Sequence, residues 1–388
     1  MNYKKYTCNA LKNRLFTWVD IDTLIQKTGI TQWQQLGTSY LGKPIRMLTL
    51  GTGPVKIMVW SQMHGDEPTA TAAIFDIINF FIAGADENQN LRNTILSNCS
   101  IYFIPLVNPD GAEAYTRSNA QKIDINRDYV AQQSPEGKLL KQVRNDLKPD
   151  FCFNMHNQST LYCTKNKQAV AMAFLAPPYD ATLQVNWVRE QAIKVIVCMV
   201  QQLQKHIPQH IARFNDAFEP RAFGDNFQAA GSSTILVESG GWLNDDEKQT
   251  IRKYNFIALL KAFEVIATQS YQNKDVINYL MLPENQKNIF HILFKNVRVK
   301  SKKGDYRLDI GLNYTEKFNP KTRTLTKLWH VEEVGDLSTY TAYTLIEGSG
   351  FYVTKPIVLA HLTNLQVFNA NHQVLYSWIK GISNHKNQ

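Results

Sequence analysis

The chain has few cysteines, and no pattern joins them. Its 388 residues contain five cysteines, an odd number at wide spacings, with no CxxC pair. The five are Cys8, Cys99, Cys152, Cys163 and Cys198. This spacing argues against a disulfide framework and against a zinc site built from cysteines.

Long apolar runs are also missing. No stretch reaches the ~20 apolar residues that a membrane-spanning helix needs. The N-terminal sequence "MNYKKYTCNALKNRLF" has no hydrophobic segment of the kind that signal peptides carry. We therefore expect a cytoplasmic protein with no membrane partner.

The formal net charge of +9 is unevenly distributed along the chain. Residues 271–388 hold 15 Lys and Arg against 9 Asp and Glu. Within this region lies the basic cluster "KNVRVKSKKGDYR". Such a cluster is more often a solvated strand edge, protected against aggregation, than a surface that binds nucleic acid. We expect no nucleic-acid partner, and nothing in the sequence predicts the oligomeric state.

The order of elements predicts two domains. Up to about residue 270, apolar strands such as "KIMVWSQM", "SIYFIPLVN", "DFCFNMH" and "STILVES" alternate with helical stretches. That alternation indicates an α/β domain with a largely parallel or mixed sheet, which we place at residues 1–270. Short strands with Gly and Asn turns follow, so residues 271–388 are predicted to form a smaller, all-β domain.

Ionisable residues stand at the ends of three predicted strands. "SQMHGDEPTATAA" places His64 and Glu67 between a strand and a helix, "FNMHNQ" places His156 after a second strand, and "ILVESGG" places Glu238 after a third. Ligands of α/β sheets bind beyond the carboxyl ends of the strands. Zinc hydrolases commonly use three nitrogen and oxygen ligands and a further carboxylate as base. His64, Glu67 and His156 fit the ligands and Glu238 fits the base.

A second histidine pair is a weaker candidate. His206 and His210 in "KHIPQHI" have the four-residue spacing of a helical metal pair. Pro208 between them interrupts the helix which that spacing requires. We therefore do not assign a metal to this pair.

The segment after "NPDG" carries groups suited to binding a carboxylate. Arg117 is followed by Asp124, Asn126 and Arg127 in "RSNAQKIDINRD". A guanidinium binds a carboxylate through two parallel contacts, and a neighbouring amide adds a donor. By itself the segment is also compatible with an ordinary surface loop.

Taken in order, these motifs resemble those of the zinc carboxypeptidase family, peptidase family M14. The resemblance covers about residues 35–250 and rests on HxxE, NPDG, the arginine with its "DxNR" segment, the strand-end histidine and the strand-end glutamate. It includes "LGTSYLGKPIRMLTLG", which looks like the family's entry into its first strands. The resemblance implies a mixed eight-stranded sheet flanked by helices, and hydrolysis of an amide bond near a free carboxylate.

The family resemblance also implies a role for each site residue. One Zn²⁺ per chain would be held by His64, Glu67 and His156, with Glu238 as general base. The resemblance makes Arg117 the residue that stabilises the carbonyl oxygen as it becomes an oxyanion, and Asn126 and Arg127 the clamp on the substrate's carboxylate. Asp124 resembles the acid that orients a ligand histidine.

Two departures from the family bear on the substrate. Asp66 stands where digestive members have an arginine, and the resulting "HGDE" resembles bacterial members that act on peptidoglycan-derived peptides, such as murein peptide amidase. In "DNFQAAGSS", Phe227 matches the mobile active-site tyrosine without its hydroxyl, either as a substrate-binding ring or as a plain core aromatic. The expected partner is a peptide or a murein peptide.

Two other functions remain open. HxxE and "DxNR" also occur in N-acyl amino acid deacylases similar to succinylglutamate desuccinylase and aspartoacylase, although the NPDG turn favours the carboxypeptidases. An inactive module that binds peptide termini is the alternative from another class. A serine hydrolase is not indicated, because no GxSxG stands at a strand end.

Overall fold

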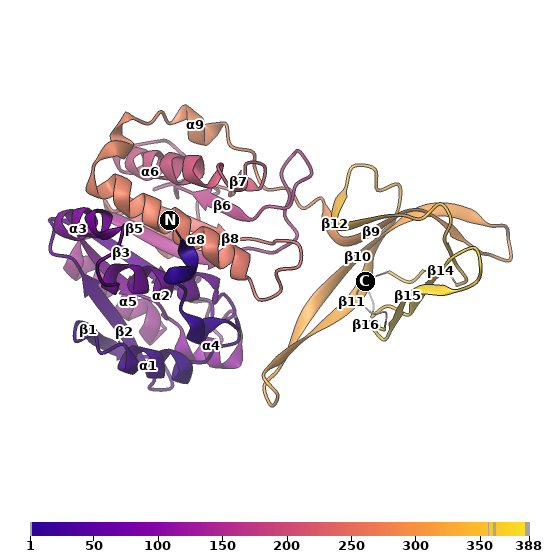
Figure 1. Ribbon diagram of the computed structural model, residues 1–388, viewed down its shortest axis with the longest axis horizontal. Coiled ribbons are helices and arrows are strands. Elements are labelled where there is room, and N and C mark those ends of the chain that lie inside the picture. The colour runs from indigo at the N-terminus through magenta and orange to yellow at the C-terminus, as the bar shows by residue number, and fades with distance from the viewer. Residues whose placement is uncertain (1, 356, 360–361, 385–388) are drawn as a thin grey trace. The chain divides into compact units, whose positions relative to one another are not determined.

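A computed structural model describes residues 2–355, 357–359 and 362–384. The chain divides into two compact units, shown with their elements in Figure 1. The first unit comprises residues 1–160 and 170–285, and the second comprises residues 161–169 and 286–388.

An eight-stranded mixed sheet forms the centre of the first unit. The strand order is β1-β2-β4-β3-β5-β8-β6-β7. The four adjacent strands β4, β3, β5 and β8 run parallel to one another. Strands β1, β2 and β6 each run antiparallel to an adjacent strand. The bounds are β1 Trp33–Thr38, β2 Pro44–Leu50, β3 Val55–Ser61, β4 Cys99–Ile104, β5 Phe151–Asn157, β6 Met172–Leu175, β7 Ile211–Arg213 and β8 Ser233–Ser239.

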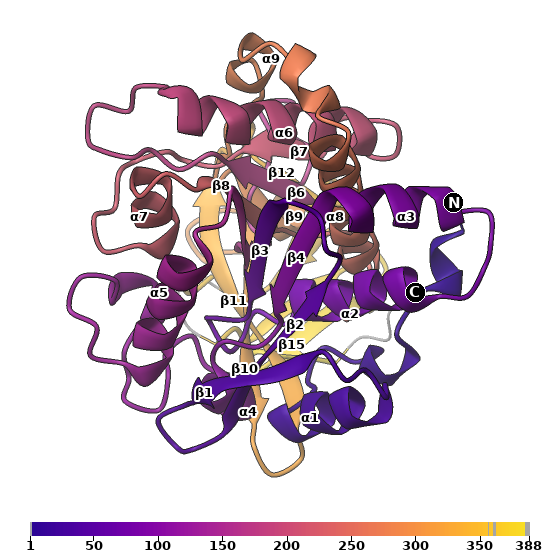
Figure 2. The ribbon, with the colours of Figure 1, turned by 90° about the vertical axis from the view of Figure 1, so that its left-hand side faces the viewer.

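Helices cover both faces of this sheet (Figure 2). Helices α2, α3, α6 and α8 pack on one face, and α5 and α7 pack on the other. The helix bounds are α1 Trp18–Lys27, α2 Thr69–Ile82, α3 Gln89–Asn98, α4 Pro109–Ala114, α5 Pro135–Leu147, α6 Trp187–Leu203, α7 Phe223–Ala229, α8 Gln249–Ala267 and α9 Ile277–Leu280. Short 3₁₀ turns lie at Tyr3–Lys5, Asn9–Leu11, Ile125–Arg127 and Ser270–Asn273.

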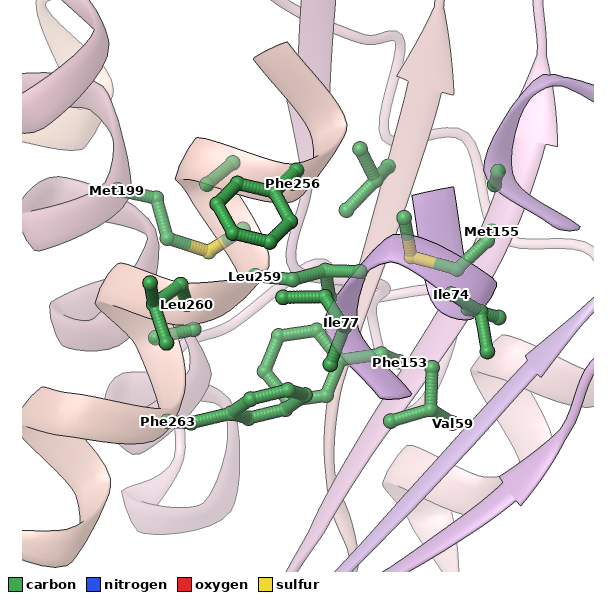
Figure 3. Packing of buried hydrophobic residues seen from close by; sticks show 14 of the residues in the cluster. Val59, Ile74, Ile77, Phe153, Met155, Met199, Phe256, Leu259, Leu260 and Phe263 are labelled. Atoms are coloured by element: carbon green, nitrogen blue, oxygen red, sulfur yellow. The ribbon is translucent and has the colours of Figure 1, made fainter. Parts of the chain in front are cut away.

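The larger core lies between the sheet and the helices α2, α6 and α8. Figure 3 shows Val59 of β3 and Phe153 of β5 packed against Ile77 of α2 and Phe263 of α8. Helix α2 is apolar around most of its circumference, which is typical of a helix buried between a sheet and other helices. This packing fixes the two strands whose ends carry the candidate ligands.

The side chains of each strand alternate between the two cores. In β5, Phe153 faces the larger core, whereas Cys152 belongs to the smaller cluster under α5 and α7. His156 has the same parity as Cys152, so it leaves the sheet on the α5 and α7 side. Glu238 is paired with His156 across β5 and β8 and therefore points to the same side.

The second unit is built around a separate β-sheet. Its order is β11-β10-β9-β13-β14-β15-β16, and β12 pairs with β9 in parallel. Phe294, Val331 and Trp378 are among the buried side chains of its core. The bounds are β9 Ile289–Val299, β10 Tyr306–Asn319, β11 Thr324–Gly335, β12 Thr341–Glu347, β13 Tyr352–Val353, β14 Leu365–Phe368, β15 Val374–Ile379 and β16 Ile382–Ser383.

The predicted α/β fold with a mixed eight-stranded sheet, followed by an all-β region, is confirmed. The division between the units falls after Asn285 and not at residue 270. The rings of Tyr271 and Tyr279 are buried in the core of the first unit, and this packing keeps the intervening segment there. Among the described helices, none is both long and apolar enough to cross a membrane.

Candidate metal centre

The loop that carries His64 and Glu67 is held by its own side chains. It begins directly after β3 at Gln62, whose φ of 51° lies in the left-handed region. The Gln62 side chain donates to the carbonyl of Gly65 at 2.8 Å and accepts from the Thr71 hydroxyl at 2.9 Å. A turn closes where the amide of Glu67 donates to the carbonyl of His64 at 3.1 Å. A left-handed backbone at a non-glycine residue is a local strain that the surrounding contacts must maintain.

The NPDG motif supports this loop from the neighbouring strand end. Asn108 donates to the carbonyl of Met63 at 3.1 Å and accepts from the amide of Gly111 at 2.8 Å. Gly65 lies against the backbone of Gly111 so closely that an added Cβ would fall 1.9 Å from the carbonyl carbon of Gly111. Glycine at position 65 is therefore required by this close approach.

Three side chains converge at the carboxyl ends of β3 and β5. The Glu67 carboxylate lies 2.8 Å from Nδ1 of His64 and 2.9 Å from Nδ1 of His156, and these two nitrogens are 3.2 Å apart. All three side chains are buried, and their ligand atoms lie within 4.8 Å of one another. Two imidazole nitrogens and a carboxylate form the donor set of many zinc hydrolases, so these residues fit a zinc ion.

The charges of the cluster are strongly coupled. Burial opposes ionisation of Glu67, but the two histidines hold the pKa of its carboxyl well below the ordinary range. Burial also acts to lower the pKa of His64, yet the carboxylates of Glu67 and Asp124 raise it to about 9. For His156, burial outweighs Glu67 and lowers the pKa. The carboxylates of Glu67 and Asp124 therefore favour a positive charge on His64.

Asp124 supports the histidine that the loop carries. Its Oδ1 lies 3.0 Å from Nε2 of His64, the ring nitrogen opposite the one that faces Glu67. The amide of Asn126 donates to the same oxygen at 2.9 Å and fixes the carboxylate. A carboxylate on the outer nitrogen orients a metal-bound imidazole and sets its tautomer.

Arg117 reaches the cluster from the chain after NPDG. Its Nη1 is 3.2 Å from Nδ1 of His64 and 3.4 Å from Glu67 Oε1, and its Nε donates to Asp124 at 3.0 Å. About half of the side chain is exposed. The guanidinium therefore lies at the open edge of the cluster, where it can contact a ligand.

Glu238 adds a second carboxylate on the adjacent strand. It is directly paired with His156 in the parallel register of β5 and β8. Only 8% of the residue is exposed, and Oε2 has no hydrogen-bond partner within the described structure. Burial, reinforced by the charge of Glu67, raises the pKa of Glu238 well above its ordinary value. A carboxylate so disposed has a high proton affinity.

Asn126 and Arg127 lie in the 3₁₀ turn Ile125–Arg127, which Asp124 caps. The Asn126 side chain lies 3.5 Å from Nε2 of His156 and accepts from the amide of Phe223 at 3.0 Å. Arg127 donates to the carbonyl of Asn126 at 2.8 Å, and its Nε lies 3.2 Å from the carboxylate of Glu219. The side-chain amide of Asn126 is thus bonded within the site, whereas the guanidinium of Arg127 forms an ion pair with Glu219 of the same chain.

The structure does not bring Phe227 to this cluster. Its ring is fully buried in α7 and packs edge-on against Trp60 and Phe223. Here it serves as a core aromatic of the smaller cluster, which is one of the two roles expected from the sequence. Asp66 lies in the loop that carries His64 and Glu67. Its Oδ1 is buried with no hydrogen-bond partner in the described part of the chain, and burial raises the pKa of its carboxyl.

Sequence reasoning missed two supporting contacts. Glu219 pairs with Arg127, and the backbone amide of Asn157 donates to Glu67 at 3.0 Å. The residue after a strand-end ligand is well placed for such a backbone contact, so Asn157 could have been found. No local pattern pointed to Glu219.

The α/β fold and the donor set fit a metal site of the kind that zinc hydrolases carry. Residues 20–199 match the family model described as zinc carboxypeptidase. The chain is 28% identical over 159 residues to Carboxypeptidase SOL1 of Arabidopsis thaliana. The aligned region covers 39% of this chain and 32% of the plant protein. The chain is 34% identical over 87 residues to Carboxypeptidase B of Astacus astacus, covering 21% and 27%.

Solved structures share the fold at low sequence identity. A metallo-carboxypeptidase from Burkholderia cenocepacia superposes with a TM-score of 0.51 at 15% identity, covering 64% of this chain and 68% of that chain. Carboxypeptidase A from Helicoverpa armigera gives a TM-score of 0.51 at 15% identity, covering 66% and 74%. Residues 20–199 of this chain are therefore similar to the zinc carboxypeptidase family, M14. The chain spans about a third or less of the length of the curated relatives above, and Glu238 lies outside the matched residues 20–199.

Proposed function

We propose that the first unit is a zinc-dependent metallocarboxypeptidase, which hydrolyses the amide bond next to a free carboxylate in a peptide. The observation that carries this proposal is the convergence of His64, Glu67 and His156 beside the buried carboxylate of Glu238, whose Oε2 has no hydrogen-bond partner among the described residues. Three ligands and a nearby base are what metal-assisted amide hydrolysis requires.

The chemistry can be assigned to the chain's own residues. Zinc held by the three ligands would polarise the scissile carbonyl and acidify a water molecule. Glu238 takes the proton from that water and delivers it to the leaving amine, a role suited to its raised pKa. Arg117, at the exposed edge of the cluster, donates to the carbonyl oxygen as negative charge develops on it.

Recognition of the substrate is assigned to Asn126 and Arg127. The guanidinium of Arg127 would bind the free carboxylate, and Asn126 would add an amide donor after a local rearrangement. The motif "HGDE" supports peptidoglycan-derived peptides as the substrate class, because Asp66 replaces the arginine of the digestive members. Asp66 would then face the part of the substrate that this arginine contacts in those members.

The test is hydrolysis by zinc-loaded protein of a panel containing ordinary peptides, murein peptides and N-acyl amino acids. Release of a C-terminal residue from peptides supports the proposal, and a preference for murein peptides supports the narrower substrate class. Turnover confined to N-acyl amino acids would favour a deacylase. Binding of peptide termini with no turnover would indicate an inactive module.

A further inference from the structure

The loop before α7 places a carboxylate between two arginines. Glu219 accepts from Nε of Arg221 through Oε1 and from Nη2 of Arg221 through Oε2, both at 2.8 Å. Its Oε2 also lies 3.2 Å from Nε of Arg127. Arg221 thus makes the two-point contact that guanidinium and carboxylate prefer, whereas Arg127 makes a single, longer one.

The backbone fixes this carboxylate beside Arg127. The amide of Glu219 donates to Asp225 at 3.0 Å, and the carbonyl of Arg221 accepts from the amide of Tyr129 at 3.2 Å. The side chains remain accessible, because 38% of Arg127 and 26% of Glu219 are exposed. An anion from solution can therefore reach Arg127, but it meets Glu219 there.

We infer that Glu219 is a specificity-determining residue, which competes with the substrate's carboxylate for Arg127 while Arg221 limits that competition. The inference rests on the proposed function, in which Arg127 binds that carboxylate. A substrate carboxylate can offer Arg127 a two-point contact in place of the single one from Glu219. After the exchange Glu219 keeps both contacts with Arg221, so neither charge is left unpaired.

This arrangement has a consequence for selectivity. A neutral chain end, such as an amide, cannot replace the anionic partner of Arg127, so Glu219 continues to hold the guanidinium. A chain end with a free carboxylate can replace it at little electrostatic cost. Glu219 therefore lowers the affinity for the free acid and leaves that for the amide unchanged, so it sets how strongly the site discriminates between the two chain ends by narrowing the difference in affinity.

The experiment compares parent, Glu219→Gln, Arg221→Gln and the double variant, all zinc-loaded. Calorimetric titration gives the Kd of N-acetyl-L-alanine and of its amide, and KM and kcat are measured on the best peptide of the panel. Glu219→Gln should tighten binding of the free acid about three- to five-fold, the scale of one partly exposed ion pair, with an unchanged kcat. Arg221→Gln should weaken that binding, because Glu219 is then free to pair fully with Arg127.

The double variant should behave like Glu219→Gln, since Arg221 acts only through Glu219. Glu264→Gln, which removes a surface carboxylate of α8 from its ion pair with Lys261, is the matched control and should leave both affinities unchanged. Opposite effects of the two single variants distinguish competition from a structural role, which would weaken binding in both.

Two outcomes overturn the inference in distinguishable ways. A parent that prefers the free acid, together with a Glu219→Gln variant that binds it equally or less tightly, refutes the competition and leaves the proposed function intact. A parent that binds free acid and amide alike, and hydrolyses no peptide, refutes the proposed function and the inference with it.

Discussion

Glu238 stands opposite His156 in the parallel pairing of β5 and β8, so a candidate metal-ligating imidazole and a carboxylate whose Oε2 has no hydrogen-bond partner among the described residues leave adjacent strands at the same level. Parallel neighbours point their paired side chains to the same face of the sheet. The sheet itself therefore sets the spacing between the proposed metal ligand and the proposed base. Two consequences of this relationship can be measured.

The first concerns the chemical role of Glu238. Glu238→Gln keeps the shape of the side chain and removes its basicity, so metal content should stay the same while turnover falls by ~10²-fold or more. Peptide hydrolysis and metal analysis measure the two quantities. Glu190→Gln, a substitution in a partly exposed ion pair of α6, is the control for loss of one carboxylate. Turnover within a few-fold of the parent would remove Glu238 from the mechanism.

The second concerns the metal. His156→Ala removes one of three converging donors and should abolish stoichiometric zinc binding and activity, because the remaining His64 and Glu67 offer only two ligands. Metal per chain and circular dichroism are measured together, so that loss of metal is separated from unfolding. His206→Ala, at an exposed position just after α6, should retain full metal content. One zinc per chain in His156→Ala would show that the metal binds elsewhere.

Arg127 can be tested by a cycle of enzyme and substrate changes. Arg127→Ala should lower kcat/KM for a free-acid substrate by about 10- to 100-fold, the range for a lost hydrogen bond to a charged group. Amidation of the substrate should cost the parent a similar factor. The two losses should not add, because both remove one interaction. Fully additive losses would mean that Arg127 binds a different part of the substrate.

The local motifs were enough to predict that His64, Glu67 and His156 lie close together. His64, Glu67 and His156 stand at strand ends, and the carboxyl ends of parallel strands lie along one edge of a sheet. Since β3 and β5 are neighbours, the structure brings the three side chains together. The reason is physical: a strand end and its following turn are set by residues close in sequence.

The contacts that could not be predicted from the sequence join segments that are far apart along the chain. Glu219 meets Arg127 because the loop before α7 packs on the turn that follows Asp124, and no periodicity encodes such a meeting. For Phe227, the position in the sequence was a poor guide. Its place along the chain matches that of an active-site tyrosine, but position along the chain does not determine which way a ring points. In α7, Phe227 lies one turn from Phe223, and both rings pack into the smaller core.

A buried ion pair of the first unit was also beyond sequence reasoning. Asp76 of α2 and Arg252 of α8 are both fully buried, 176 positions apart, and Arg252 donates to Asp76 through Nε at 2.8 Å and Nη2 at 2.6 Å. The same aspartate accepts from the Tyr3 hydroxyl and the Cys8 amide, both at 2.6 Å. The pair therefore ties the N-terminal segment to two core helices.

Breaking that pair should destabilise the fold. Arg252→Met leaves the Asp76 carboxylate buried without its cation, which typically costs about 3–5 kcal/mol of unfolding free energy. Urea unfolding measures this difference. Lys261→Met, which disrupts a partly exposed pair with Glu264 on the same helix, should cost at most about 1 kcal/mol. Equal losses in the two variants would show that the buried pair contributes no more than a surface contact.

Asp225 provides a test of pH dependence away from the metal ligands. It lies in the first turn of α7, largely buried, with its Oδ1 accepting the amide of Glu219. Burial, opposed by this hydrogen bond and reinforced by the charge of Glu219, raises its pKa from 3.8 to about 6, while Arg127 acts in the opposite direction. In the unfolded chain the carboxyl returns to its ordinary pKa.

Because the folded protein binds this proton more tightly than the unfolded chain, the stabilising contribution is complete below pH 3.8 and is lost as the pH rises through 6. The difference corresponds to roughly 3 kcal/mol above pH 6. Asp225→Asn keeps an acceptor for the Glu219 amide but cannot ionise, so it should match the parent at low pH and be more stable at pH 8. Urea unfolding of both proteins at pH 4, 6 and 8 measures the gap. A gap that stays constant across these values would mean that Asp225 ionises in the folded protein as readily as in the unfolded chain, and one that widens toward acid would mean that it ionises more readily there.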